Sequence, residues 1–357
     1  MTDAALLMVG LEGPELTLEE ARRYEVLQPA GYILFSRNIV SPQQTRKLTD
    51  DLRGLHGSIP PIIAIDQEGG RVSRTKDIAP SAPSASEFAT YDDMGLIADA
   101  AAHTADLLRL LGCNLNLAPV LDIDHHPDKS NALRGRAWGS DNQRVIDRAG
   151  HWNRWLRKRH MASCAKHFPA GGRAQSDPHH DLPTSKATLE EMLADDVIPY
   201  TALMPELDAV MLAHVEFLHV DLGRPASLSP VMIQRFLRDQ LGFDDHLVLT
   251  DDLDMGAIQQ RYGGVEDARM AIEAGNDLAL ICHQTERAVA AADAITTLPH
   301  GLLDDARQRV EGFRLKRIQH PLDWSDALWD KTCQGLEAIR KEVPVDGHDP
   351  QSPVEDY

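Results

Sequence analysis

Residues 162–183 read ASCAKHFPAGGRAQSDPHHDLP, a short apolar run followed by a long polar segment. The run at 162–165 has the length and the small apolar side chains of a buried strand. The segment after it is rich in Gly, Pro, His and Asp, and it has neither helical nor strand periodicity. Long polar loops that leave the end of a strand commonly carry catalytic groups, so this stretch predicts a strand and a functional loop.

The same alternation of apolar runs and amphipathic segments recurs along the chain. Eight strands are predicted, at residues 4–9, 31–35, 61–65, 114–121, 162–167, 209–214, 246–250 and 277–281. Helices are predicted between them, at 17–27, 42–55, 94–111, 142–159, 188–204, 230–241 and 265–274. Strands that alternate with helices indicate right-handed βαβ units and a parallel sheet. Eight such units predict an α/β fold of the closed (β/α)8 TIM-barrel type.

A doubly wound open sheet is the alternative architecture. Against it, the glycines at 10–13 (GLEG), after the first strand, lack the spacing of a phosphate-binding fingerprint. Further helices at 286–297, 303–314 and 325–341 are expected to close and pad the barrel, which gives one domain over residues 1–342. Residues 343–357 are rich in Pro, Asp and Glu and are predicted to form an acidic, disordered tail.

Composition narrows the function classes. The 36 basic and 55 acidic side chains give a net charge of −19, which should repel nucleic acids and anionic lipid. No cysteines are paired at metal-binding spacing, and Cys113, Cys164 and Cys282 lie in apolar runs, so buried thiols are favoured over disulfides. The N-terminus lacks the features of a signal peptide, and no apolar run reaches the roughly 18 residues that span a bilayer. We therefore expect a cytoplasmic monomer or dimer.

Charged residues collect where the predicted strands end. In a TIM barrel these carboxyl ends form the active-site face. The residues at these ends are Asp66, Glu68, Arg71, Asp122, Asp124, Lys166, His167, His214, Asp251 and Asp252. The strand starts, by contrast, follow turns such as 58–60 and 242–244. This asymmetry predicts a polar ligand with many hydroxyl or amide groups.

Each of these residues also has a structural interpretation. Asp66 and Glu68 could cap elements or form salt bridges, and ligand contact is favoured only for Asp66. Lys166 and His167 are predicted to contact the ligand, because burying a lysine for structure alone is costly. Structural hydrogen bonding and ligand contact both remain open at Asp122, Asp124 and His214.

Two groups have the chemistry of glycosyl transfer. Asp251 and Asp252 follow an apolar strand, and because adjacent strand residues point opposite ways, only one of them can face the barrel axis. A carboxylate there can attack an anomeric carbon and leave as a stable anion. A second group must protonate the leaving oxygen. His179 can do so, since Asp177 lies near enough to orient its ring and raise its basicity.

Six motifs, in this order, carry a resemblance to a known family. They are 31–35 (GYILF), 65–72 (IDQEGGRV), 166–169 (KHFP), 177–179 (DPH), 225–230 (PASLSP) and 250–255 (TDDLDM). Over about residues 6–314 the chain resembles family 3 glycoside hydrolases, and within them the single-domain bacterial β-N-acetylglucosaminidases of the NagZ type.

The resemblance implies retaining hydrolysis of terminal β-linked N-acetylglucosamine by a double displacement, with no cofactor or metal. It implies Asp251 as the nucleophile and His179 as the acid/base, assisted by Asp177. The carbohydrate substrate by this resemblance is a muropeptide or chitin fragment, which would place the protein in peptidoglycan recycling. The positions that match sugar-binding residues are Asp66, Arg74, Arg136, Lys166 and His167.

The chain departs from the family at the rim of the pocket. The usual Phe-Pro-Gly-His-Gly-Asp loop reads FPAGGR at 168–173, so Gly171 and Arg173 replace a histidine and an acid. The segment 124–136 is about two residues longer than usual, and GRAW at 135–138 replaces a more usual Arg-Ser-Phe. These changes bear on the choice of sugar and aglycone.

Other functions stay open on the sequence. A histidine acid/base does not repel phosphate, so a β-N-acetylglucosaminide phosphorylase is one alternative, and a family 3 glycosidase of different sugar specificity is another. A metal-dependent hydrolase could bind its metal through acidic strand ends and neutral imidazoles. The candidate imidazoles are those of His125, His126, His179 and His180. The non-enzyme alternative is a sugar-binding barrel that has lost turnover.

Overall fold

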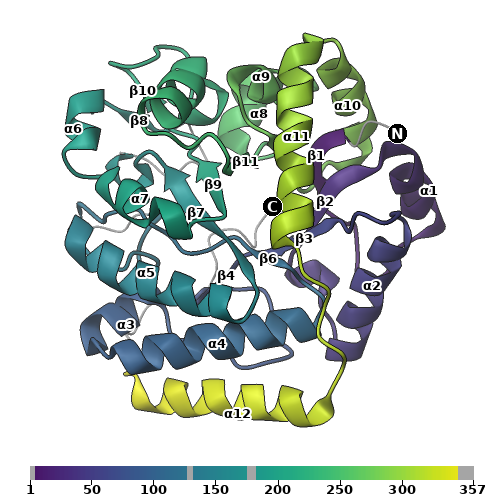
Figure 1. The fold of residues 1–357 in the computed structure, drawn as a ribbon, viewed down its shortest axis with the longest axis vertical. Helices are drawn as coiled ribbons and strands as arrows, with labels where there is room; N and C mark the ends of the chain where they lie inside the picture. Colours follow the sequence, from purple (N-terminus) through teal and green to yellow (C-terminus); the bar gives the residue numbers. More distant parts are fainter. Residues whose placement is uncertain (1–4, 127–131, 175–181, 345–357) are drawn as a thin grey trace.

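Eight parallel strands close into a barrel in the computed structural model, which describes residues 5–126, 132–174 and 182–344 (Figure 1). The strands follow one another around the barrel in chain order, with β12 pairing with β1. They are β1 (Ala5–Val9), β2 (Pro29–Leu34), β3 (Ile62–Ile65), β6 (Leu115–Asn116), β7 (Ala162–Phe168), β9 (Ala209–Leu212), β11 (Leu247–Asp252) and β12 (Leu278–Ile281). The predicted TIM barrel is therefore confirmed, and the open-sheet alternative is wrong.

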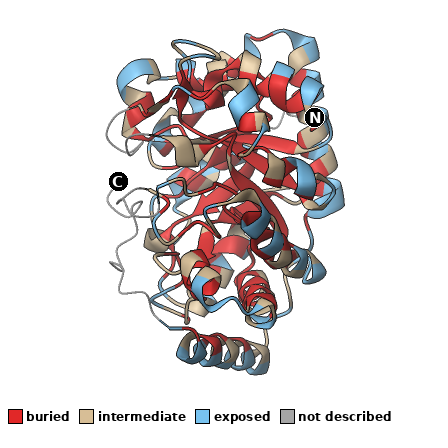
Figure 2. Ribbon diagram, turned by 90° about the vertical axis from the view of Figure 1, so that its left-hand side faces the viewer, coloured by how far each residue is buried: buried red, intermediate tan, exposed pale blue. Residues whose placement is uncertain are grey.

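Helices surround the strands and bury their apolar faces against them (Figure 2). Several begin at capping boxes, in which Thr17 or Ser41 accepts from a main-chain amide that has no partner within its helix. The helices are α1 (Leu18–Leu27), α2 (Pro42–Gly54), α3 (Ala85–Tyr91), α4 (Met94–Leu110), α5 (Asn142–Lys158), α6 (Leu189–Leu193), α7 (Ile198–Leu203), α8 (Gly256–Tyr262), α9 (Glu266–Ala274), α10 (Ala288–Thr296), α11 (His300–Arg317), α12 (Asp326–Glu342) and the π-helix η5 (Val231–Gln240).

Two predicted elements differ from the structure, and proline accounts for both. The strand predicted at 114–121 pairs regularly only over β6 and then by a single bridge at Val120, because Pro119 has no N–H for the ladder. The helix predicted at 188–204 is divided into α6 and α7. Pro199 lies in the first turn of α7, where its missing N–H is tolerated, whereas it could not continue the preceding helix.

Two small sheets at the ends of the barrel strands were too short to predict. β4 (Gln67–Gly69) and β5 (Val72–Ser73) form an antiparallel hairpin directly after β3. β8 (Thr184–Ser185) pairs with β10 (Glu216–Phe217) in parallel.

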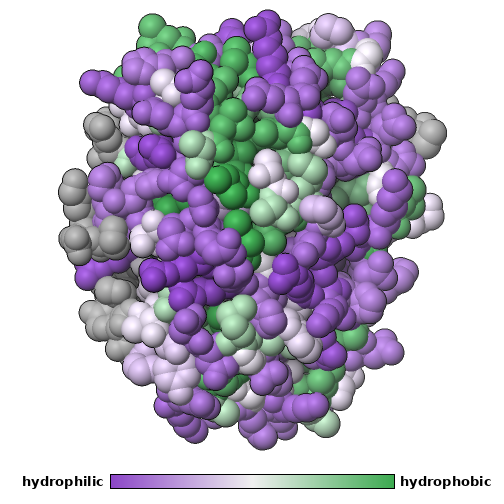
Figure 3. Space-filling view, turned by 60° about the vertical axis from the view of Figure 1, so that its left-hand side comes forward, coloured by the Kyte–Doolittle hydropathy of each residue, from purple (hydrophilic) through white to green (hydrophobic). Residues whose placement is uncertain are grey.

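The core is continuous across all eight strands and the inward faces of the helices. All four cysteines are free thiols, and Cys113, Cys164 and Cys282 are buried as predicted. On the face drawn in Figure 3, hydrophilic side chains predominate around a narrower hydrophobic band. Across the described residues, every helix is too short or too polar to cross a bilayer.

The last helix, α12, packs along α4 on the outside of the barrel (Figure 1). Arg340 near its end donates to Glu87 of α3, with 2.6 Å between nitrogen and oxygen. Of the predicted acidic tail, residues 345–357 lie outside the described residues.

Asp277 ties four elements together at the end of the barrel opposite the polar strand ends. Its carboxylate, which is fully buried, accepts from the Val248 amide at 2.8 Å, from Arg238 of η5 at 2.9 Å and from Arg309 of α11 at 2.7 Å. Buried charges are tolerated only when paired in this way. Asp277 is therefore a stability residue that connects β11, β12, η5 and α11.

Replacing Asp277 with alanine should destabilise the fold strongly, because two guanidinium groups then lose their shared carboxylate. We expect a loss of about 3–5 kcal/mol in the free energy of unfolding, measured by urea denaturation. Glu273→Ala is the control, since Glu273 pairs with Arg269 on the surface and its removal should cost below about 1 kcal/mol. Equal losses in the two variants would contradict this role.

Candidate active site

A buried lysine lies at the centre of the polar strand ends. Lys166 belongs to β7, and its side chain is 3% exposed. Its Nζ lies 2.6 Å from Asp66 Oδ1 and 2.7 Å from Glu68 Oε1, both of which follow β3. Burial alone would lower the pKa of Lys166, but these two carboxylates raise it above its ordinary value. The ammonium therefore stays charged inside the barrel mouth.

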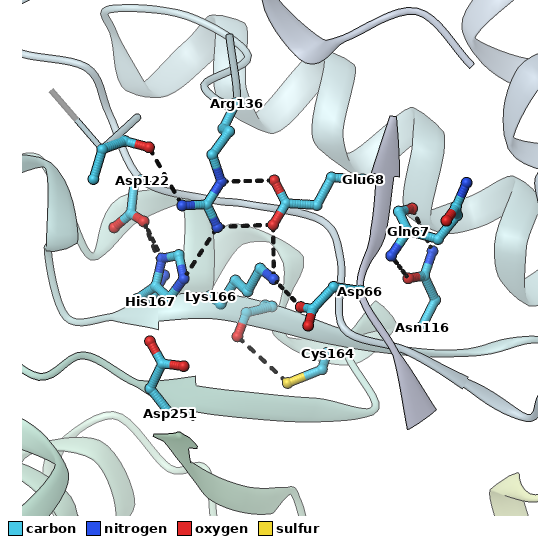
Figure 4. A network of polar contacts seen from close by, with 12 residues as sticks. Asp66, Gln67, Glu68, Asn116, Asp122, Arg136, Cys164, Lys166, His167 and Asp251 are labelled. Atoms are coloured by element: carbon cyan, nitrogen blue, oxygen red, sulfur yellow. Dashed lines mark hydrogen bonds and ion pairs between the residues drawn. The ribbon is translucent and has the colours of Figure 1, made fainter. Parts of the chain in front are cut away.

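Glu68 joins this lysine to Arg136, which comes from the long segment after β6. Arg136 Nε and Nη2 each donate to Glu68 at 2.8 Å in a bidentate pair (Figure 4). Burial raises the pKa of Glu68, but Arg136 and Lys166 outweigh it and hold that pKa well below its usual range. Glu68, for which the sequence favoured a salt-bridge role, does form one, and it is built into the site.

Two amide side chains hold the segment after β3 in place. The Asn116 side chain, from β6, accepts from the main-chain N–H of Gln67 and donates to its main-chain carbonyl, both at 3.0 Å. Gln67 Oε1 accepts from the main-chain amide of Arg74 at 2.9 Å. Arg74 Nη2 in turn lies 3.6 Å from Asp66 Oδ2, which places the predicted sugar-binding Arg74 beside Asp66. The apolar pattern within one strand does not predict such bonds between neighbouring segments.

His167 is held by Asp122, a carboxylate whose role the sequence left open. Asp122 Oδ2 lies 2.7 Å from His167 Nδ1 and accepts from the His167 amide at 3.0 Å. The other ring nitrogen, Nε2, lies 3.5 Å from Arg136 Nη2. The imidazole therefore joins the Arg136–Glu68–Lys166 network on the same side of the barrel mouth (Figure 4).

Asp251 lies at the end of β11, on the far side of His167 from Asp122 (Figure 4). Its side chain is half-buried, and its Oδ1 accepts from the Asp252 amide at 2.8 Å. Burial raises the pKa of Asp251, but His167, His214, the Asp252 amide and Lys166 together bring it below its ordinary value. A carboxylate that is ionised at neutral pH and lies beside the polar groups at the strand ends has the properties of a nucleophile.

The neighbouring Asp252 faces the other way, as the alternation of strand side chains requires. Its Oδ1 accepts from the main-chain amides of Asp254 at 2.9 Å and Cys282 at 3.3 Å. Burial and the adjacent Asp254 raise the pKa of Asp252 to about 8. Asp252 is therefore a structural carboxyl that links β11 to the segment after β12.

His214 contacts the main chain of β11 directly after Asp251. It is 2% exposed, with Nδ1 at 2.7 Å from Ser227 Oγ and Nε2 at 2.9 Å from the Asp252 carbonyl. Burial lowers its pKa. Both ring nitrogens have protein partners, which favours a structural role, and sugar contact by His214 stays a prediction.

The family model described as "Glycosyl hydrolase family 3 N terminal domain" matches residues 6–312. The chain belongs to glycosyl hydrolase family 3. It is therefore an enzyme that hydrolyses glycosides, and the resemblance seen in its motifs is confirmed. The match begins inside β1 and includes the other seven barrel strands in full.

Curated relatives of this family 3 enzyme are β-hexosaminidases. One from Pseudomonas aeruginosa is 32% identical over 326 residues, covering 90% of this chain and 96% of the relative. Another, from Methylococcus capsulatus, is 35% identical over 296 residues, with coverage of 81% and 86%.

Solved structures agree with this assignment. A family 3 β-N-acetylglucosaminidase from Paenibacillus sp. str. FPU-7 has a TM-score of 0.88 at 31% identity and covers 96% of this chain and 68% of its own. Native NagZ from Neisseria gonorrhoeae has a TM-score of 0.81 at 29% identity, with coverage of 96% and 97%.

The predicted acid/base cannot be placed relative to these groups. His179 and Asp177 both lie outside the described residues, as does His180. Their convergence with Asp251 stays a prediction. The structure does bring together the predicted sugar-binding residues Asp66, Arg74, Arg136, Lys166 and His167.

Of the four histidines proposed as metal ligands, His125 and His126 are among the described residues. His125 lies near Asp195 and Asp196, with its Nε2 at 2.7 Å from Asp196 Oδ1. The Arg173 guanidinium occupies the other side of this pair, with Nε at 2.5 Å from Asp196 Oδ2. A guanidinium of the chain itself thus balances the two carboxylates, and within the described residues these groups form no hydrogen bond or ion pair with Asp251.

Stability should depend on pH through Asp252, because its folded pKa of about 8 lies above the unfolded value of about 3.9. The folded state keeps the proton over this window while the unfolded state loses it, so this group makes folding less favourable as pH rises from about 4 to 8. Asp252→Asn should remove that dependence. We expect the variant's free energy of unfolding, relative to the parent, to increase steadily with pH across this window in urea titrations.

The control for this measurement is Asp245→Asn, an exposed aspartate near the start of the same strand. Its stability relative to the parent should stay level over the same window. A parallel pH trend in both variants would contradict the assignment to Asp252.

Proposed function

We propose that this family 3 enzyme is a retaining β-N-acetylhexosaminidase that removes terminal β-linked N-acetylglucosamine. The observation that carries the proposal is the position of the Asp251 carboxylate at the end of β11, beside His167 and its network of buried, charge-paired polar groups (Figure 4). The β-hexosaminidase relatives support the sugar class. NagZ from Neisseria gonorrhoeae has also been solved with N-trifluoroacetyl-D-glucosamine, a ligand of the same class.

The polar ring suits a sugar with several hydroxyl groups. Asp66 retains acceptor capacity for a hydroxyl beyond its bond to Lys166, and the Arg136 guanidinium has N–H groups beyond the two that it donates to Glu68. Because their carboxylate partners hold these cations in fixed positions, little ordering remains to be done when the sugar binds. Arg74, Arg136 and Lys166 are all nearly buried, so their hydrogen bonds act in a site of low dielectric constant.

The proposed reaction has two displacements. Asp251 attacks the anomeric carbon while protonated His179 gives its proton to the glycosidic oxygen, so that the aglycone leaves as an alcohol. His179, oriented by Asp177, then takes a proton from water, which attacks the glycosyl ester and frees Asp251. Two inversions give net retention. Proton transfer of this kind contributes about 10²–10⁴ in rate.

The biological setting is proposed from the same relatives. A single catalytic domain over residues 1–342, acting in the cytoplasm as a monomer or dimer on muropeptide fragments, fits the NagZ-type structure that matches over 97% of its length. Chitin fragments offer the same terminal sugar and are the second candidate substrate. No metal or other cofactor enters the proposed mechanism.

Replacing Asp251 with alanine should abolish turnover of an aryl β-N-acetylglucosaminide, because it removes the carboxylate proposed to form the glycosyl ester. We expect kcat to fall by at least about 10³-fold, within the range lost when a catalytic nucleophile is removed. Asp245→Ala, at the opposite end of β11, is the control and should keep parental kcat. Near-parental turnover by Asp251→Ala would show that another residue is the nucleophile.

The stereochemistry and the acceptor can be tested together by proton NMR of the first-formed product. We expect the β-anomer of N-acetylglucosamine to appear first and to mutarotate later. Added phosphate should neither accelerate the reaction nor produce a sugar 1-phosphate. A first-formed α-anomer contradicts retention, and a phosphate-dependent sugar 1-phosphate identifies a phosphorylase.

A further inference from the structure

We propose that Asp122 is a positioning residue that fixes the His167 ring and, with the same carboxylate, the turn that follows β7. That turn is the short 3-10 helix η2 (Gly171–Arg173). The inference rests on the proposed function, because His167 is assigned to the sugar-binding ring. It goes beyond that function because Asp122 is not one of the proposed sugar-binding residues. Its assigned role is to hold His167, which is one of them.

One carboxylate serves three donors. Asp122 Oδ2 receives the His167 Nδ1–H at 2.7 Å and the His167 amide at 3.0 Å, while Oδ1 receives the Gly171 amide at 2.7 Å. The Asp122 side chain is fully buried. A buried carboxylate is costly unless its lone pairs are satisfied, so these three bonds hold His167 and Gly171 in a single arrangement.

The bond at Nδ1 determines which way the other edge of the His167 ring points. With Nδ1–H donated to Asp122, the Nε2 edge is turned toward Arg136 Nη2, 3.5 Å away (Figure 4). A carboxylate behind an imidazole fixes its tautomer and its orientation. The charged and titratable groups around His167 are Asp122, Arg136, Lys166, His214 and Asp251.

Gly171 is fitted to the same carboxylate. A Cβ at this position would lie 2.9 Å and 3.0 Å from the two Asp122 oxygens and 3.1 Å from its Cγ. A side chain at this position would require the carboxylate or the turn to shift, so glycine suits the close approach at which the main chain donates.

The far end of η2 is held separately. Arg173 donates to Asp196 at 2.5 Å, and Asp196 also contacts His125 at 2.7 Å. The side-chain partners of Asp196 are thus His125 and Arg173 rather than His167. Asp196 therefore provides a matched variant that loosens the same turn without touching the imidazole.

The test uses Asp122→Asn in the full chain. An amide keeps the shape of the side chain but can accept at only one of its two positions, so its NH₂ must face at least one N–H of His167 or Gly171. We expect kcat/KM on an aryl β-N-acetylglucosaminide to fall about 10–100-fold, the range that outer partners of functional histidines carry at metal centres.

A spectroscopic readout separates positioning from general damage. An Nδ1–H donated to a carboxylate should give a downfield, slowly exchanging proton resonance, assigned by its loss in His167→Gln. In Asp122→Asn it should move upfield or exchange away, because a neutral oxygen is a weaker acceptor than a carboxylate. In Asp196→Asn the His167 resonance should stay in place, while the ring resonance of His125 changes.

Gly171→Ala tests the same pair without removing the charge, in case Asp122→Asn folds poorly. It should also lower kcat/KM and shift the His167 resonance, whereas Gly13→Ala, where a Cβ meets open space, should do neither. The inference is overturned if both Asp122→Asn and Gly171→Ala leave the His167 resonance unchanged and kcat/KM within twofold of the parent. If the parent cleaves no N-acetylglucosaminide, the proposed function fails, and the resonance alone decides the role of Asp122.

Discussion

A lysine ammonium buried in the mouth of the barrel is the constraint on which the site depends. Lys166 lies inside β7 and could not remain charged there without the two carboxylates within 2.7 Å. One of these, Glu68, also binds Arg136 through both oxygens. Desolvation of each charge is offset by the next, so the network holds only as a whole. Its geometry, rather than any single bond, gives the pocket its fixed set of donors and acceptors.

The barrel supplies these charges from strands that are distant in the chain. Asp66 and Glu68 follow β3, Arg136 follows β6, and Lys166 and Asp251 lie near the ends of β7 and β11. Closure of the parallel sheet brings the carboxyl ends of all these strands to one face. At the opposite face, Asp277 performs a similar pairing for stability alone. A buried carboxylate between two cations therefore occurs at both ends of the barrel, as Glu68 in the site and as Asp277 at the opposite face.

Much of this arrangement could be predicted from sequence because it follows from periodicity. The eight apolar runs gave the barrel, and the position of Asp66, Lys166 and Asp251 after those runs gave the polar mouth. Proline limited the prediction at Pro119 and Pro199, where an apolar pattern continued past a residue that cannot donate to a ladder or extend a helix. At both positions the apolar pattern predicted burial correctly, but it did not predict where the strand ladder and the helix are interrupted.

The roles of Glu68 and Asp122 could not be read from periodicity, because both depend on partners far along the chain. Glu68 meets Arg136 across 68 positions, and Asp122 meets His167 across 45. Nothing local marks such pairs, and only closure of the barrel reveals them. The contact between Gly171 and Asp122 is likewise visible only in the folded barrel, where a Cβ at position 171 would lie 2.9 Å from a carboxylate oxygen.

The most direct measurement is mass spectrometry of enzyme treated with a ring-fluorinated N-acetylglucosaminyl fluoride. The ring fluorine slows both displacements, and the fluoride leaving group lets the ester form faster than water removes it. The account predicts one sugar per chain, attached to the peptide that contains Asp251. A covalent sugar on a different residue, or turnover of the reagent with no covalent species at all, would contradict it.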